Sequence, residues 1–322
     1  MRSGNPYIFE MNTPLLSVIV CTYNRADILP VCLRSLAGQT LAKSLYEVIV
    51  VDNNSNDATR QIAQFYVAHA ENFSLLVEEA SGLSHARNRG WREARGEYVA
   101  FVDDDCKMPP QWARVARDVI QHVRPAVFGG SSFAFYNSPK PSWYKDSYLL
   151  HDFGEYARAL SVNEHLDGMN MCFRRDVFEV VGGFDSTLGM TGRTIAYGEE
   201  TELMSRVRMM MPGEIIYYHP DFFVYHLVRA EKMNLRREMM VRFANGRYSR
   251  RLFGAPSQFS GFNLFTQLAR TLYYLLLDLL RAFFTRDRAQ YPYAQNYLYE
   301  RAFQHLRSLG ELYEQYAQLS KR

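Results

Sequence analysis

The sequence has few cysteines and no long uninterrupted apolar run. Its first dozen residues lack the continuous apolar segment of a signal peptide. The most apolar stretch, residues 262–284, is interrupted by Arg270, Asp278 and Arg281, so we do not expect it to span a bilayer. The four cysteines show none of the paired spacings of a disulfide framework or a zinc knuckle; they are Cys21, Cys32, Cys106 and Cys172. A cytoplasmic protein fits these absences best.

Net charge is small as well. The formal charge of +3 over 322 residues gives no reason to expect nucleic acid as a partner. Positive charge is nevertheless concentrated between Val224 and Gly254, where eight basic residues stand against Glu231 and Glu238. A solvated helix face and a surface for phosphates or anionic lipid both explain this cluster, and both readings stay open. The basic residues are Arg229, Lys232, Arg236, Arg237, Arg242, Arg247, Arg250 and Arg251.

The first 130 residues alternate short apolar runs with amphipathic stretches, which is typical of an α/β sheet with helices on both faces. The apolar runs are rich in Val and Ile without polar alternation, which predicts buried and mostly parallel strands. We expect strands over residues 15–21, 46–51, 73–78, 97–102 and 125–130. We expect helices over residues 26–36, capped near Asp27, 57–70, with Asp57 as N-cap, 83–94 and 110–122.

The rest of the chain divides into three kinds of segment. Residues 131–167 are aromatic and too rich in proline for a regular element, so we expect a substrate loop or lid there. A second compact portion follows, with a helix that begins at Glu199, two apolar segments and a basic helix after Arg229. Two long helical patterns, residues 262–285 and 291–320, close the chain. We therefore predict three regions: 1–130, 131–254 and a helical extension over 255–322.

Polar residues follow three of the predicted strands. They are the stretches "TYNRAD" (22–27), "DNNSND" (52–57) and "DDDC" (103–106). Each could be an ordinary polar turn with a helix cap. In an open parallel sheet, however, ligands bind beyond the carboxyl ends of the strands, so all three stretches should line one crevice.

Three consecutive carboxylates after a buried strand repel one another unless water or a cation offsets their charge. Mg²⁺ and Mn²⁺ use carboxylates in this way and bridge them to a substrate diphosphate. On an extended backbone, Asp103 and Asp105 point to one side, and Asp104 turns inward or caps the helix that begins near Pro109. A solvated acidic loop is the competing explanation, but it does not account for acids at the end of a buried strand.

Seven separated blocks carry a resemblance to a known family. In order they read "LLSVIVCTYNRADIL", "EVIVVDNNSND", "GLSHARNRG", "GEYVAFVDDDC", "GMNMCFRR", "VGGFD" and "GEETEL". The pattern resembles the family 2 nucleotide-sugar glycosyltransferases with the GT-A fold, whose Rossmann-like, mostly parallel central sheet is flanked by helices. It covers residues 15–254 and leaves the C-terminal helices outside.

The resemblance implies a donor and metal site. Asp105 corresponds to the direct metal ligand, Asp103 lies nearer the ribose and diphosphate, and His226 falls where a third ligand is often found, with His219 as a competitor. The family often has an acid at the position of Asn53, so this departure leaves the nucleobase open among uridine, thymidine and guanosine. The implied donor contacts are Thr22, Tyr23, Asn24, Arg25, Asp52, Asn53, Arg87, Asn88, Asp103 and Asp104.

The resemblance also implies a catalytic base. The family has an acid pair where a helix begins, and this pair corresponds to Glu199 and Glu200. The second acid, Glu200, corresponds to the base, where the family usually has Asp. An inverting transfer needs one carboxylate to take the acceptor hydroxyl proton. Acids in the first turn of a helix also simply complement its N-terminus, which is the competing explanation for Glu199, Glu200 and Glu202.

The predicted activity follows from these implications. We expect a Mn²⁺- or Mg²⁺-dependent inverting glycosyltransferase that moves one sugar from a nucleotide-diphospho-sugar, with UDP as the expected nucleotide, to a glycan or lipid-linked acceptor. Processive members carry a Gln-x-x-Arg-Trp motif that this sequence lacks. The alternatives are a nucleotidyltransferase, although "CTYNRAD" has neither a Gly-rich loop nor a Lys, and a degenerate transferase that acts as a scaffold.

Three further features stay open from the sequence. The segment over residues 262–284 could pack in the core, form a homodimer, or attach the protein peripherally to the inner face of a membrane. Trp143 could stack on a sugar ring or anchor its loop. The basic residues Arg229, Lys232 and Arg236 are spaced to share one helix face and could clamp phosphates.

Overall fold

The computed structural model describes residues 13–191, 198–254 and 261–320, which form two compact units. The first unit contains Leu149–Thr187, Glu199–Leu227 and the described part of Met1–Ala134. The second contains Phe135–Tyr148, the described part of Leu188–Gly198 and that of Val228–Arg322. The predicted boundaries at residues 130 and 254 stay predictions.

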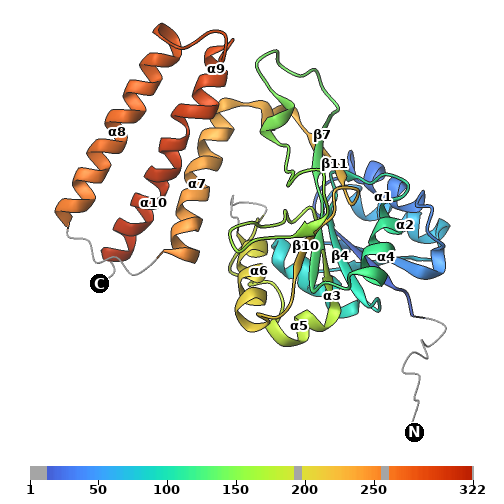
Figure 1. Ribbon diagram of the computed structural model, residues 1–322. Helices are drawn as coiled ribbons and strands as arrows, with labels where there is room; N and C mark the ends of the chain where they lie inside the picture. Colours follow the sequence, from blue (N-terminus) through green and yellow to red (C-terminus); the bar gives the residue numbers. More distant parts are fainter. Residues whose placement is uncertain (1–12, 192–197, 255–260, 321–322) are drawn as a thin grey trace. The chain divides into compact units, whose positions relative to one another are not determined.

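An eight-stranded sheet forms the centre of the first unit (Figure 1). Its order is β3-β2-β1-β4-β9-β6-β10-β8. The first four strands in this order are parallel, whereas β9 runs antiparallel between β4 and β6. The strands are β1 Leu16–Thr22, β2 Tyr46–Asp52, β3 Phe73–Val77, β4 Tyr98–Asp103, β6 Val127–Gly129, β8 Arg158–Ala159, β9 Asn170–Arg174 and β10 Ile216–Tyr218.

Helices cover both faces of this sheet, as predicted. Val18 and Val20 of β1 point into one apolar cluster, and Ile19 between them points into the other. The first cluster is completed by α1 Leu29–Ala37, α2 Thr59–His69 and α4 Trp112–His122. The second is completed by α3 Leu83–Glu93, α5 Arg175–Val181 and α6 Glu199–Met210. Burial on both faces explains the continuous apolar runs in the strands.

The predicted elements are correct in kind, but two predicted helix caps are wrong. Helix α2 begins at Thr59 with Ala58 as its N-cap, and Asp57 instead accepts hydrogen bonds from the Thr59 and Ala26 amides, at 2.9 and 3.2 Å. Helix α1 begins at Leu29 after Ile28, without a side-chain cap. Asp57 therefore fastens the turn after β2 to the turn after β1.

The segment 131–167 is more regular than its composition predicts. Strand β7, Ser132–Tyr136, lies within it and joins β5, Cys106–Lys107, and β11, Val224–Val228, in a small sheet of order β5-β11-β7. The prediction of an irregular segment is wrong for Ser132–Tyr136, because the prolines come only after β7 and pairing with a distant strand overrides local composition.

The second unit is built on three long helices. They are α7 Leu235–Phe253, α8 Gly261–Phe284 and α10 Gln304–Leu319, with α10 between the other two (Figure 1). The short helix α9, Ala294–Tyr297, passes into α10 through a π-helical turn, η4, Leu298–Ala302. Within the described residues, no helix combines the length and the apolar character needed to cross a bilayer.

Glycines bring α7 and α10 close together. A β-carbon at Gly246 of α7 would overlap the carbonyl oxygen of Arg307, and one at Gly310 of α10 would overlap that of Phe243. Glu314 of α10 also accepts from Arg251 Nε at 2.5 Å and from Arg247 Nε at 3.2 Å. The two helices therefore pack backbone to backbone, and ion pairs reinforce one end of the contact.

The loop that carries Trp143 packs within the second unit. Asn296 Nδ2 donates to the Tyr148 hydroxyl at 2.7 Å and also to the Trp143 carbonyl, at 2.5 Å. The rings of Tyr148 and Tyr299 stack at 3.9 Å, and the indole of Trp143 lies 6.4 Å from the ring of Tyr299. These contacts favour the loop-anchor role for Trp143.

Candidate active site

The carboxyl ends of β1, β2 and β4 lie at the same edge of the sheet. Cys21 of β1 is paired with Asp103 of β4, and Thr22 is paired with Asp52 of β2. The three polar stretches predicted to share a crevice therefore begin at adjacent positions. Asp103 is the last residue of β4, and β5 begins at Cys106 directly after the acids.

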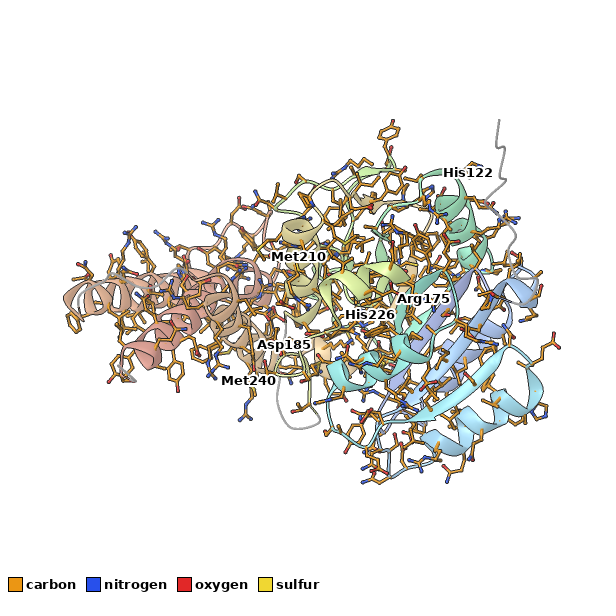
Figure 2. All side chains as sticks on the ribbon, turned by 90° about the horizontal axis from the view of Figure 1, so that it is seen from below. His122, Arg175, Asp185, Met210, His226 and Met240 are labelled. Carbon is orange, nitrogen blue, oxygen red and sulfur yellow. The ribbon has the colours of Figure 1, made fainter. Side chains whose placement is uncertain are left out.

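Two of the three acids gather with a histidine. Ligand atoms of Asp103, Asp105 and His226 all lie within 4.8 Å of one another, and His226 Nε2 lies 3.2 Å from Asp105 Oδ1. The small sheet creates this proximity, because His226 of β11 is paired with Cys106 of β5 and the Leu227 amide donates to the Asp105 carbonyl at 2.9 Å. Figure 2 labels His226 among the packed side chains. The competitor, His219, is not part of the cluster; its Nδ1 accepts from the Asp221 amide at 3.2 Å.

The donor set of this cluster fits a divalent cation. Two carboxylate oxygens and one imidazole nitrogen suit Mn²⁺, and carboxylates alone suit Mg²⁺. Asp105 is only 8% exposed, so bulk water does little to screen its carboxylate from that of Asp103, whose side chain is 35% exposed. A bound cation would offset their repulsion.

Asp104 points away from this cluster and is buried. Its Oδ1 lies 3.7 Å from Arg25 Nε, and burial together with the adjacent Asp105 raises the pKa of Asp104 to about 7. Helix α4 has Gln111 at its N-cap, so the predicted capping role of Asp104 is wrong and the inward orientation is the one observed. Asp104 and Asp105 form the turn between β4 and β5, and this turn gives the two neighbouring acids different environments.

Arg87 connects the cluster of Asp103, Asp105 and His226 to the start of α6. Its Nη1 lies 2.9 Å from Glu199 Oε1, and its Nη2 lies 3.5 Å from Asp103 Oδ1 and 3.3 Å from the Gly168 carbonyl. Burial opposes the charge of this guanidinium, but the carboxylates of Glu199 and Asp103 outweigh it and raise the pKa of Arg87. In the sequence, Glu199 is only a helix-terminal acid, because nothing local signals a partner 112 residues away.

Glu200 has an unusual environment for a carboxylate. Burial, followed by the neighbouring charge of Glu199, raises its pKa to about 8. Among the described residues, its Oε2 atom has no hydrogen-bond partner. A carboxyl group with one unoccupied oxygen and a raised pKa is a stronger base than an exposed glutamate once it is deprotonated. Tyr197, which directly precedes the stretch "GEETEL", lies outside the described residues.

The first turn, after β1, contains one structural residue and two accessible ones. Asn24 has a left-handed φ of 52°; its amide donates to Ser55 Oγ at 3.0 Å, and its side-chain oxygen accepts from the Asn56 amide at 2.9 Å. It therefore fastens this turn to the turn after β2. Tyr23 is 42% exposed, and the Arg25 side chain is partly exposed, so both are accessible to a ligand.

Three other predicted contact residues are engaged within the protein. Asp52 is fully buried and accepts from Arg60 Nε at 2.7 Å and from the Ser55 amide at 3.0 Å. Asn53 Nδ2 donates to the carbonyls of Glu78 and Ala80, at 2.9 and 2.7 Å, and its Oδ1 accepts from the Gly82 amide at 2.8 Å. Only the second lone pair of Asn53 Oδ1 remains to meet a base.

The side chain of Asn88 also makes three hydrogen bonds. Its Nδ2 donates to the Phe184 carbonyl and its Oδ1 accepts from the Phe184 amide, both at 2.8 Å, while Trp91 Nε1 donates to the same oxygen at 3.1 Å. These bonds hold α3 against the segment after α5. The Asn88 side chain therefore positions α3, and with it the neighbouring residue Arg87.

The fold and this arrangement of acids identify the class of protein, and the family follows from the sequence comparison. The chain belongs to glycosyl transferase family 2, whose family model matches residues 17–182. It is 34% identical over 177 residues to glycosyltransferase AglE of Haloferax volcanii, covering 54% of this chain and 57% of that protein. It is 28% identical over 225 residues to the glucosyl-dolichyl phosphate glucuronosyltransferase of the same organism, covering 66% and 68%. The chain thus spans little more than half the length of AglE.

Solved structures share the fold at low sequence identity. Residues 1–349 of TarS from S. aureus, in complex with UDP-GlcNAc, align with a TM-score of 0.55 at 19% identity, covering 95% of this chain and 92% of that chain. The mannosyltransferase PcManGT from Pyrobaculum calidifontis, in complex with GDP-Man and Mn²⁺, aligns with a TM-score of 0.55 at 17% identity, covering 92% and 74%. The predicted GT-A fold is therefore confirmed.

Proposed function

We propose that this protein is a metal-dependent, inverting glycosyltransferase that moves one sugar from a nucleotide-diphospho-sugar to a glycan or lipid-linked acceptor. The observation that carries the proposal is the cluster of Asp103, Asp105 and His226 at the end of β4, in a chain of glycosyl transferase family 2. These three residues would hold Mn²⁺ or Mg²⁺, which when bound stabilises the departing diphosphate.

The chain's own residues supply the remaining steps. The acceptor hydroxyl oxygen forms a bond to the anomeric carbon while the bond from that carbon to the diphosphate breaks, and the hydroxyl proton passes to Glu200 Oε2. Arg87 positions both halves of the site, since it pairs with Glu199 beside the base and with Asp103 in the cluster. Tyr23 and Arg25 are the accessible residues we assign to the nucleotide, with Thr22, Asn24, Asp52, Asn53 and Asn88 holding their turns in place.

UDP is the nucleotide we propose first, and the neighbour solved with UDP-GlcNAc supports this choice. Another neighbour was solved with GDP-Man, so a screen should compare UDP-, TDP- and GDP-sugars. The basic residues Arg229, Lys232 and Arg236 belong to the second unit, and their role as phosphate clamps stays a prediction. We also propose a cytoplasmic location; the structure forms no disulfide among its four cysteines, which is compatible with a reducing compartment.

Donor hydrolysis tests the proposal without knowledge of the acceptor. The wild-type protein should release nucleoside diphosphate from one donor when Mn²⁺ or Mg²⁺ is added, and chelation should stop the release. Asp105→Ala should lower this rate at least about a hundredfold, because the cation loses a ligand. The control, Asp118→Ala, removes a surface acid of α4 that pairs with Arg117 and should leave the rate unchanged.

Two outcomes would contradict the assignment. If Asp105→Ala kept near-normal turnover, the metal would lie elsewhere. If the wild-type protein bound none of UDP, TDP and GDP in calorimetric titrations with Mn²⁺, the scaffold alternative would replace the enzyme. A nucleotidyltransferase would instead release pyrophosphate from a nucleoside triphosphate and a sugar phosphate.

A further inference from the structure

Helix α8 uses one face to pack inside the second unit. Leu275, Leu279 and Ala282 contact the apolar cluster around Phe303 at the start of α10. Asp278 on the same face is buried, accepts from the Tyr297 hydroxyl at 3.0 Å and lies 2.9 Å from His305 Nε2. The only acid of α8 is therefore occupied by partners within the unit.

The outer face of α8 is apolar along its length. We define the apolar stripe as five exposed side chains: Phe265, Leu272, Leu276, Leu280 and Phe283. At 3.6 residues per turn they lie within an arc of about 80°. Their exposed fractions run from 47% for Leu272 to 66% for Phe265, which is high for large apolar side chains of a packed unit.

The charges beside the stripe have one dominant sign. The exposed charged side chains of α8 are Arg270 and Arg281. Arg286 and Arg288 follow in the next turn, with Asp287 as the single acid between them. Helix α7, on the other side of α10, carries further arginines. It lies in the segment of residues 224–254, which contains eight basic residues and two acids. An apolar stripe with basic residues beside it complements a membrane surface, in which anionic headgroups lie over an apolar layer of acyl chains.

The charge pattern also argues against a second copy of this chain as the occupant. Arg270 and Arg281 lie on one side of α8, about 80–100° around the helix from the edge of the stripe, so a second copy packed on the stripe would not cover them. Asp278 is the only acid of α8, and it already lies 3.4 Å from Arg281 Nη1 and 2.9 Å from His305 Nε2 within its own chain. A second copy of the same helix therefore offers no further acid to Arg270, whereas lipid phosphates would pair with the exposed arginines.

Aromatic side chains border the stripe. Tyr273 is 62% exposed and Phe284 is 80% exposed, and Tyr274 carries Arg270 over its ring at 5.8 Å. Tyrosine has an apolar ring and a polar hydroxyl, and it is enriched where a helix meets lipid headgroups. The order of apolar, aromatic and basic side chains around α8 is thus that of a helix lying in a membrane interface.

We propose that α8 attaches this protein to the surface of an anionic membrane. The helix lies parallel to the surface, the apolar stripe enters the boundary between headgroups and acyl chains, and Arg270 and Arg281 pair with lipid phosphates. This binding goes beyond the proposed transferase activity and does not depend on it. It would hold the protein at the surface on which a lipid-linked acceptor is presented.

Vesicle sedimentation tests this attachment with the full-length chain. The wild-type protein should sediment with vesicles that contain phosphatidylglycerol, should bind pure phosphatidylcholine vesicles far less, and should be released by salt. The double variant Leu272→Glu, Leu276→Glu should lower vesicle affinity at least about tenfold, because two carboxylates would enter the interface. Replacing Arg270 and Arg281 with Gln should lower affinity for anionic vesicles about fivefold for each arginine.

A matched control separates the helix from general surface apolarity. Phe65→Glu alters a side chain of α2 that is 57% exposed, similar to Leu276, and should leave vesicle binding unchanged. Leu and Glu have similar helix propensity, so far-UV circular dichroism of the α8 variant should match the wild type. Asp105→Ala should retain full vesicle binding, which distinguishes failure of this inference from failure of the proposed activity.

Three results would overturn the proposal. The first is a wild-type protein that ignores anionic vesicles. The second is a wild-type dimer in sedimentation velocity runs without lipid that Leu272→Glu, Leu276→Glu converts to a monomer, which would assign the stripe to a second copy. Equal loss of vesicle binding in the Phe65→Glu control would also remove α8 as the attachment site.

Discussion

At the scale of single residues, the site depends on one arginine shared between carboxylates. Arg87 pairs with Glu199 and Asp103, so its charge supports both the acid cluster and the start of α6. Glu200 lies beside this pair but has no ion pair of its own among the described residues. Burial, followed by the neighbouring charge of Glu199, raises the pKa of Glu200 to about 8, so Glu200 keeps a proton near neutral pH.

The raised pKa of Glu200 predicts a pH-dependent rate. Below a pKa of about 8 the base is protonated, so the transfer rate at saturating donor should rise about tenfold per pH unit and level off above that value. Glu200→Gln should bind the donor normally, lose at least about a hundredfold in transfer, and lose this pH dependence. Glu202→Gln is the control, since Glu202 pairs with Arg206 in the same helix turn. A normal transfer rate in Glu200→Gln would place the base elsewhere.

The same residue should affect stability in the metal-free protein. The folded pKa of about 8 exceeds the ordinary 4.5, so between these values the folded state holds a proton that the unfolded state has lost. The free energy of unfolding contributed by Glu200 is therefore fully present below about pH 4.5 and is lost as the pH rises through about 8. Urea unfolding with chelator measures this effect. The free energy of unfolding of Glu200→Gln should fall less than that of the wild type between about pH 4.5 and about pH 8.

Residue-level prediction from the sequence succeeds where the signal is local. Asp103 ends a strand that the sequence predicts, Asp105 follows in the turn before β5, and these two acids belong to the cluster while Asp104 does not. The Arg87–Glu199 pair could not be predicted, because its members are 112 residues apart and each has an ordinary local context. The hydrogen bonds of Asn53 and Asn88 within the protein could not be predicted either, since hydrogen-bond partners depend on the folded backbone.

At the scale of elements, close packing of α7 on α10 relies on Gly246 and Gly310. Glycine costs about 1 kcal/mol relative to Ala inside a helix, so two helical glycines at one crossing need a packing reason. The reason is the approach of each glycine to a carbonyl oxygen of the other helix. The contact replaces side-chain interdigitation with backbone proximity.

Gly310→Ala should therefore destabilise the protein although it raises helix propensity. The added methyl group would force the helices apart, at a cost of about 1–3 kcal/mol that exceeds the gain in propensity. Gly213→Ala is the control, because a β-carbon there would meet no atom within 4 Å. Thermal unfolding followed by circular dichroism checks both variants. An unchanged or raised Tm for Gly310→Ala would contradict the packing argument.

Sequence patterns predict elements well when burial is uniform. Strands β1 to β4 and helices α1 to α4 fall within a few residues of their predicted ranges, because apolar runs and amphipathic spacing are local properties. Strand β9 was not assigned to the sheet, since its antiparallel place between β4 and β6 depends on partners far along the chain. Strand β7 was missed for the same reason.

At the scale of the whole molecule, the second unit is assembled from separated segments. Residues 135–148, parts of 188–198 and everything described after 228 belong to it. The loop near Trp143 depends on Asn296, Tyr299 and Glu300, and Lys145 Nζ lies 2.6 Å from Glu300 Oε1. The sequence predicts that helices close the chain, but it gives no sign that they hold a loop from its middle.

Removal of residues 255–322 should consequently damage more than the deleted helices. Helix α7 would lose Gly310 and Glu314 as contacts, and the Trp143 loop would lose Asn296 and Tyr299. Far-UV circular dichroism should show a loss of helix beyond that of the deleted residues, and limited proteolysis should cut within residues 135–148. The eight-stranded sheet should retain its own thermal transition. A truncated chain with α7 and the loop still protected would contradict this interdependence.

The π-helical turn η4 restricts where this chain can accept an insertion or a deletion. A π turn holds one residue more than an α turn, so it shifts the phase of α10 against α9 by about 100°. That shift lets Asn296 and Tyr299 face the Trp143 loop while Gly310 faces α7. Deleting one residue from Leu298–Ala302 would restore a regular helix and turn one of these faces away from its partner. The length of this helix and the presence of the loop are therefore coupled, and an insertion or deletion in one should be accompanied by a change in the other.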